Sequence, residues 1–251
     1  MCGRYATARA RQELLDEFQV ELDASEDALE PDYNVAPTKS VPAVIQRAPK
    51  DSDEALRTLR KLRWGLVPSW AKDLSMGSRL INARIETVHE KPAFRRAFAK
   101  RRCLLPADGF YEWYELKTPG EKPKKPKKQP FFIRPRDGAV MAMAGLYELW
   151  RNPEDEWVWT CTVITTAATD EVGRIHDRMP MIVEPSQWAA WLDPANDDPD
   201  TVRGLLEPAM AGRMEAFPVS TSVNNVRNNG PSLVEPLPDG DISGEYGATL
   251  F

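Results

Sequence analysis

Alternation of apolar and polar positions dominates the middle of the chain and predicts a series of strands. Short segments rich in β-branched and aromatic residues recur there, separated by turn residues, and this pattern is typical of half-buried strands. The predicted strands are Val41–Gln46 and residues 56–68, 102–106, 109–116, 130–135, 139–150 and 157–166.

Helical spacing of apolar residues is confined to short segments. Residues 7–22 carry Leu14, Leu15 and Phe18 at helical spacing, with Thr7 as the expected N-cap. Further short helices are predicted over residues 89–102, 185–193 and about 201–210. Because strands outnumber helices and seldom alternate with them, we expect an α+β fold with a mainly antiparallel sheet.

Composition narrows the class of protein. With 251 residues and 42% hydrophobic residues, the chain can bury a substantial core as one large domain or two small ones. Three cysteines without a CxxC pair predict neither a disulfide framework nor a metal site, so a reduced, intracellular protein is expected.

Early arginines disfavour a signal peptide, and no segment has the roughly 20 apolar residues of a membrane span. The net charge of −5 disfavours a generally basic nucleic-acid-binding protein but is compatible with a local basic face.

The second residue, Cys2, carries distinctive chemistry if Met1 is removed. Its α-amine and thiol would then lie on adjacent carbons, and an amine with a pKa near 7.7–8.0 can condense with an aldehyde. The thiol would then close a five-membered thiazolidine ring. Alternatively, an activated thiolate could act as the nucleophile of a peptidase. Position alone favours an inert small residue at a frayed chain end.

Two predicted strands carry candidate polar groups. In "INARIET", alternation places Asn82, Arg84 and Glu86 on one face, where Arg84 could hold a phosphate or simply pair with Glu86. In "GFYEWYEL", Glu112 is surrounded in sequence by aromatic residues, which would raise its pKa toward the range useful for proton transfer. Trp113 points to the opposite face, where it could contact a base or pack a second core.

One of the two histidines lies where it could act as an acid or a base. His176 sits at a predicted loop–strand junction beside Asp177, which could fix its tautomer, although a structural role is the commoner one. The Lys- and Pro-rich segment 117–130 is expected to be an exposed hairpin loop, equally suited to solubility or to attracting phosphate. Residues 237–251 are expected to form a loosely attached tail.

Several motifs occur together in the order and spacing of one family. They are "MCGRYA", "YNVAPT", "WGLVPSWA", "INARIET", "GFYEW", "ITTAA", "IHDRMP" and "PVSTSVNNVRNNGPSLVEP". Over residues 2–236 the chain resembles the SRAP family of abasic-site processing proteins. The resemblance implies a single compact α+β domain around a curved, mainly antiparallel, barrel-like sheet flanked by short helices.

The resemblance also implies a function and its residues. It implies binding of single-stranded DNA at abasic sites and a thiazolidine crosslink between Cys2 and the ring-opened sugar, without a cofactor or metal. Asn82, Glu112 and His176 match the family residues at the sugar, with Glu112 as the proton shuttle. The remaining matches, expected to contact DNA, are Arg4, Pro37, Trp70, Arg84, Trp113, Thr165 and Arg178.

Two other functions remain open. Cys2 and His176 could serve a cysteine peptidase that does no more than remove Met1, or the chain could be a noncovalent nucleic-acid-binding module. We expect a monomer, cytoplasmic and nucleoid-associated or else nuclear, with no membrane partner and with replication-fork proteins as candidate partners. The enzyme class stays open among a self-crosslinking repair protein, a lyase-like activity and autoproteolysis.

Overall fold

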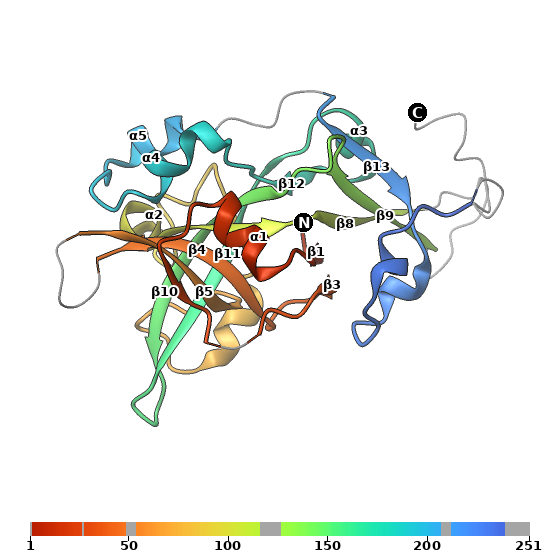
Figure 1. Ribbon diagram of the computed structural model, residues 1–251. Coiled ribbons are helices and arrows are strands. Elements are labelled where there is room, and N and C mark those ends of the chain that lie inside the picture. The colour runs from red at the N-terminus through yellow and green to blue at the C-terminus, as the bar shows by residue number, and fades with distance from the viewer. Residues whose placement is uncertain (1, 27, 49–53, 116–126, 207–211, 239–251) are drawn as a thin grey trace.

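The computed structural model describes residues 2–26, 28–48, 54–115, 127–206 and 212–238 (Figure 1). The larger of its two sheets has eight strands and closes on itself, because β11 pairs in parallel with β5 as well as antiparallel with β10. The closed ring runs β5, β4, β7, β10, β11 and back to β5. The strands of this sheet are β2 (Leu22–Ala24), β4 (Ser40–Arg47), β5 (Leu56–Trp64), β6 (Asn82–Arg84), β7 (Arg102–Ala107), β10 (Met141–Arg151), β11 (Trp157–Ala167) and β12 (Arg178–Pro180).

A second sheet holds the amino-terminal segment in place. Its order is β13-β9-β8-β1-β3, so the short β1 lies between two other strands and all three of its residues are buried. Tyr5 opposes Phe110 and Ala6 opposes Gly109, where an added Cβ would come within 2.3 Å of the Phe132 ring. The strands are β1 (Tyr5–Thr7), β3 (Asp32–Val35), β8 (Gly109–Glu115), β9 (Lys128–Pro135) and β13 (Met214–Pro218).

The helices are short and lie around the sheets. In Figure 1, α4 and α5 lie together at one edge, and the β10–β11 hairpin extends away at another. The helices are α1 (Arg11–Glu17), α2 (Arg95–Lys100), α3 (Asp170–Ile175), α4 (Trp188–Leu192) and α5 (Pro199–Gly204), with 3-10 turns η1 (Leu74–Arg79), η2 (Pro185–Gln187), η3 (Thr221–Asn224) and η4 (Pro231–Leu233).

Two helix predictions are corrected. Thr7 is not an N-cap, because it belongs to β1 and the first helix begins only after Ala10. Pairing of the amino-terminal segment with β3 and β8 outweighs its helical pattern. The helix predicted over 201–210 begins at Pro199, capped by Asp198, and ends at Gly204.

Alternation along the strands separates two cores. Val41, Ala43 and Ile45 of β4 face the barrel interior, whereas Val44 between them joins the outer core under the helices. The predicted α+β fold, with a mainly antiparallel, barrel-like sheet in one compact domain, is confirmed. The boundary at residue 236 stays a prediction. The Leu237 N–H donates to the Pro218 carbonyl, and residues 239–251 lie outside the described part of the chain.

Close backbone packing positions the loop after β5. Gly65 has a φ of +126°, and a Cβ added there would lie 2.7 Å from the Gly77 carbonyl oxygen in η1. Only glycine tolerates both the left-handed conformation and the contact. The Gly65 N–H donates to the Cys161 carbonyl of β11, so the loop that continues to Trp70 is anchored directly on the barrel.

Candidate active site

Cys2 is buried, and the expectation of a frayed, exposed position is wrong. Pairing of β1 with β3 and β8 draws the residues before Tyr5 into the interior core, where Cys2 has no exposed surface. Its carbonyl oxygen accepts a hydrogen bond of 2.8 Å from Asn82 Nδ2. Asn82 belongs to β6 and opposes Val163 of β11, so the barrel itself fixes the partner of Cys2.

The other end of the Asn82 amide carries no partner. Asn82 Oδ1 is buried and accepts no hydrogen bond from any described residue. A buried acceptor without a partner is costly, by about 1–3 kcal/mol, and is uncommon in native structures. Asn82 therefore combines a structural hydrogen bond with an acceptor that a ligand can use.

Glu112 lies on the face that the strand pattern predicted. Phe110 and Tyr114 pack against the barrel core, whereas Tyr111 and Trp113 belong to a separate cluster on the opposite face of β8. Only 4% of Glu112 is exposed, and burial is the main cause that raises its pKa. The pKa of Glu112 is therefore shifted in the predicted direction, toward the range useful for proton transfer.

The pKa of the Cys2 thiol is also shifted, in the direction that favours the protonated, neutral form. Burial is the main cause that raises its pKa well above the ordinary value, and the negative charge of nearby Glu112 raises it further. A thiol in this setting is a poor source of thiolate.

His176 ends α3 and faces the same group of residues. Its charge favours the ionised form of Glu112, which indicates that the two side chains lie near each other. The Arg178 N–H donates to His176 Nδ1 over 3.0 Å, so a neutral ring carries its proton on Nε2. Asp177 Oδ1 lies 2.9 Å from the same nitrogen. While Nδ1 accepts from the Arg178 N–H it has no proton to donate, so Asp177 can accept a hydrogen bond from Nδ1 only when the ring is charged.

The three predicted basic residues differ in how far they are already engaged. Arg178 donates two hydrogen bonds to Glu86 and a third, of 2.6 Å, to the main-chain oxygen of Thr165, which is itself buried. Glu86 lies beyond the end of β6, so it pairs with Arg178 and not with Arg84. The Arg84 side chain is exposed and makes no hydrogen bond or ion pair within the described residues, although its charge helps to lower the pKa of Glu86.

Arg4 is hydrogen-bonded to the segment around η3, for which the sequence motifs predict no role. Its guanidinium donates to Asn34 Oδ1 and to the Val223 carbonyl, and lies 5.7 Å from the centre of the Trp113 ring. Asn34 is fully buried and donates to the carbonyls of Val223, Asn225 and Asn228. The only sequence signal for Asn34 was its place in the "YNVAPT" motif.

The two remaining residues that were predicted to contact DNA, Trp70 and Pro37, lie in loops. Trp70 is 58% exposed in the loop after β5, and Pro37 is half-buried in the turn between β3 and β4. The structure thus brings Cys2, Asn82, Glu112 and His176 together, and leaves Trp70 and Arg84 as exposed side chains.

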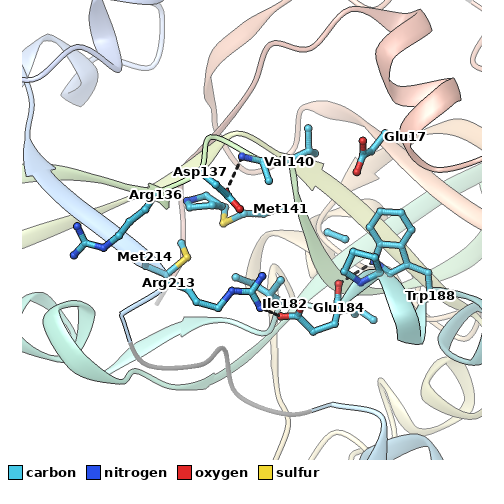
Figure 2. A pocket seen from close by; sticks show the side chains of 15 residues that line it. Glu17, Arg136, Asp137, Val140, Met141, Ile182, Glu184, Trp188, Arg213 and Met214 are labelled. Carbon is cyan, nitrogen blue, oxygen red and sulfur yellow. Dashed lines mark hydrogen bonds and ion pairs between the residues drawn. The ribbon is translucent and has the colours of Figure 1, made fainter.

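A separate hollow of about 310 Å³ lies between the ends of β9, β10 and β13 (Figure 2). Met141, Ile182 and Trp188 line it, and an Arg213–Glu184 ion pair of 2.6 Å lies at its edge. None of the predicted site residues lines this hollow. In the described part of the chain, no group of three His, Cys, Asp or Glu side chains is arranged to hold a metal ion. The helices that the structure describes are all too short or too polar to cross a membrane.

Fold and site together define an α+β protein in which a closed five-stranded barrel surrounds a buried cysteine next to asparagine, glutamate and histidine. The chain belongs to the SRAP family, because the family model described as SOS response associated peptidase matches residues 1–226.

Named relatives and solved structures agree. The chain is 42% identical to abasic site processing protein YoqW of Bacillus subtilis (strain 168), over 94% of this chain and 99% of that protein. It is 34% identical to abasic site processing protein HMCES of Gallus gallus, over 82% of this chain and 66% of that protein. A crystal structure of a protein from Bacteroides thetaiotaomicron has the same fold, with a TM-score of 0.79 and 24% identity, over 94% of this chain and all of that one.

Proposed function

We propose that the chain binds single-stranded DNA at abasic sites and bonds covalently to the lesion through Cys2. The names of the relatives support the abasic site as the target. The observation that carries the proposal is the burial of Cys2 between the Asn82 amide and the Glu112 carboxyl group. The reaction requires removal of Met1, which gives Cys2 a free α-amine beside its thiol.

The proposed chemistry forms two bonds at one carbon. The ring-opened sugar presents an aldehyde at C1′, and the α-amine nitrogen adds to it with loss of the carbonyl oxygen as water. The thiol sulfur then bonds to the resulting imine carbon while the thiol proton passes to nitrogen, which gives a thiazolidine. An α-amine with an ordinary pKa of 7.7–8.0 is partly neutral at neutral pH, so it can begin this sequence.

Glu112 is the proposed proton shuttle. Because burial raises its pKa, its carboxyl group is protonated over a wider pH range and can donate a proton to the departing oxygen. The same group can take a proton back during ring opening. His176 is the second proposed hydrogen-bond donor at the sugar, through Nε2, because its Nδ1 accepts from the Arg178 N–H.

Asn82 is the proposed positioning group. Its Nδ2 holds the Cys2 main chain, and its buried Oδ1 can accept a hydrogen bond from the amine or from a sugar hydroxyl. A ligand that supplies this hydrogen bond satisfies an otherwise costly buried acceptor.

The state of the Cys2 thiol favours this reaction over peptide cleavage. A cysteine peptidase needs a thiolate stabilised by a nearby base, and hence a lowered pKa. Here both burial and Glu112 raise the pKa of the thiol. Thiazolidine formation starts from the neutral amine, so a protonated thiol does not impede its first step.

Exposed groups near the site supply the proposed DNA contacts. Arg84 is exposed and unpaired within the described residues, so it can hold a phosphate, and exposed Trp70 can stack on an unpaired base. The net charge of −5 means that binding depends on such local groups and should weaken as salt rises.

A denaturing gel with an end-labelled abasic single-stranded oligonucleotide tests the proposal. The intact mass of the purified protein first establishes whether Met1 is absent, and the expected result is then a shifted, heat-resistant band. Cys2→Ala should abolish this band.

Cys161→Ala is the matched control, because Cys161 is an equally buried cysteine of the same core and should be dispensable. If protein lacking Met1 gives no shifted band, or if Cys161→Ala loses it as Cys2→Ala does, the proposed reaction is wrong. Peptide cleavage that depends on Cys2 and His176 would favour the peptidase instead.

A further inference from the structure

A second group of polar side chains, which the proposed reaction does not use, lies where the interior face of the barrel strands reaches solvent: Arg47 is exposed, and Arg60, Arg101 and Trp159 are half-buried. On β11, Trp159 lies on the same interior face as Val163, the residue that opposes Asn82. The two positions are four residues apart along the strand, which corresponds to about 13 Å at 3.3 Å per residue. The second group therefore lies well apart from Cys2.

Strand alternation brings arginines to this level of the barrel. Arg47 continues the interior row of Val41, Ala43 and Ile45 on β4, and Arg60 continues the row of Leu62 and Trp64 on β5. Arg101 immediately precedes β7. We call Arg47, Arg60 and Arg101, together with Tyr147 and Trp159, the arginine cluster.

Two of these guanidinium groups lie over one aromatic ring, that of Trp159. The carbon centres of the Arg60 and Arg47 guanidinium groups lie 4.2 Å and 5.7 Å from the centre of the Trp159 ring. Tyr147 stacks against the same indole at 5.7 Å. A stacked guanidinium is held in place through its face, while the N–H donors around its edge stay available.

Those donors are largely unused by the protein. The Arg47 side chain makes no hydrogen bond or ion pair within the described residues, and Arg60 has a long ion pair of 3.8 Å with the exposed Glu26. Arg101 pairs with Glu148 over 2.7 Å, but its buried Nε has no acceptor among the described residues. Arg47 and Arg101 also both act to lower the pKa of Tyr147 against the effect of burial, which places both charges near the Tyr147 hydroxyl group.

Arg102, the next residue along the chain, shows the contrast. It is fully buried and donates five hydrogen bonds to main-chain oxygens, of Phe98, Ala99, Trp191, Asp193 and Asn196. The fold thus supplies a main-chain acceptor for each N–H donor of this structural arginine. Arg47 and Arg60 have no such set of main-chain acceptors, and their guanidinium groups are open to solvent and to a ligand.

We propose that the arginine cluster is a phosphate-binding site, separate from the cysteine site. Two guanidinium groups beside one indole place several N–H donors near each other, and a phosphate group has enough oxygens to accept from both. The phosphate belongs either to a nucleic-acid backbone or to a small phosphate ester, because both present the same group to these donors.

The test uses the full-length protein with inorganic phosphate as the probe. Binding is followed by the broadening of the phosphorus-31 resonance during titration. The variants are Arg47→Gln, Arg60→Gln and their combination, and the matched control is Arg203→Gln, which removes the same charge from α5. Equal thermal melting of all variants shows that each is folded.

The combined variant should weaken phosphate binding at least about tenfold, since each lost charge-assisted hydrogen bond is worth roughly that factor. The control should stay within about twofold. Absence of phosphate binding by the parent protein, equal weakening by Arg203→Gln, or equally strong arginine-dependent binding of acetate would each overturn the proposal.

A second arm identifies the source of the phosphate. The affinity of an end-labelled oligothymidine without abasic sites is measured by fluorescence anisotropy across a range of salt concentrations. If the backbone is the source, the combined variant binds more weakly and its salt slope falls by about 0.7 for each lost contact. If oligothymidine binding is unchanged while inorganic phosphate binding is lost, the source is a small phosphate ester. A crosslinking failure at Cys2 would leave both measurements unaffected.

Discussion

The cysteine site and the arginine cluster occupy two levels of the same barrel, and they treat polar groups in opposite ways. At the cysteine site, burial pushes an acid and a thiol toward their neutral forms, and the Cys2 main chain is fixed by Asn82. In the arginine cluster, the permanent cations of Arg47 and Arg60 lie over the Trp159 ring, and the Arg47 side chain makes no hydrogen bond within the described residues. Titratable groups in a low-dielectric interior suit proton transfer, whereas guanidinium groups that never lose their charge suit the capture of an anion.

The largest expected effect concerns the acid of the cysteine site. Glu112→Gln keeps the shape of the side chain but removes its titratable proton, so crosslinking of abasic DNA should slow by about a hundredfold, the lower range of general acid–base catalysis. Single-turnover rates at saturating protein measure this effect separately from binding. Crosslinking by Glu112→Gln at the parent rate would remove Glu112 from the mechanism.

A smaller loss is expected for the positioning residue. Asn82→Ala removes the 2.8 Å hydrogen bond to the Cys2 carbonyl and the buried acceptor, and should slow crosslinking about tenfold. The pH profile of the rate should keep its shape, because the acid is unchanged. A profile displaced as in Glu112→Gln would mean that Asn82 acts through proton transfer instead.

The exposed arginine tests how the protein approaches DNA. Arg84→Ala should weaken single-stranded DNA binding several-fold and lower the slope of log affinity against log salt by about 0.7, since it removes one phosphate contact. The comparison variant is Arg203→Ala on α5, which should change neither quantity. An unchanged salt slope for Arg84→Ala would place the phosphate contact elsewhere.

Stability should respond to pH at the cysteine site. Because the pKa of Glu112 is raised in the folded state, the native protein binds this proton more tightly than the unfolded chain does. The contribution to stability is complete below the ordinary pKa of 4.5 and is lost as pH rises through the folded value. It amounts to about 1.4 kcal/mol for each tenfold difference in proton affinity between the folded and unfolded states. Melting temperatures measured across this window should therefore fall less in Glu112→Gln than in the parent protein. Parallel curves for the two proteins would contradict the raised pKa.

The smallest expected effect tests whether the cysteine site and the arginine cluster act independently. Arg47→Gln combined with Arg60→Gln should leave the saturated crosslinking rate within about twofold, although phosphate binding falls. A large loss of crosslinking rate in this variant, with melting unchanged, would show that the two sites act as one.

Much of the fold could be predicted from local pattern. Alternation identified the longer strands β4, β5 and β7 to β11, including the opposite faces of Phe110 and Tyr111 in β8, but it missed the short strands β1, β2, β3 and β13. The pattern failed at Thr7, because helical spacing in residues 7–22 competes with the pairing of β1 with β3 and β8, which lie far along the chain. The Lys- and Pro-rich segment lies largely outside the described residues, so its predicted loop stays a prediction.

The sequence by itself determined the residue types of the cysteine site, since Cys2, Asn82, Glu112 and His176 each occur in a motif whose chemistry can be named. Only the tertiary structure decided their environment. Burial of Cys2, the raised pKa of Glu112 and the unused Asn82 acceptor arise from strands distant in sequence. The arginine cluster had no sequence signal, because its members are single positions on different strands, and only closure of the barrel brings them around one indole.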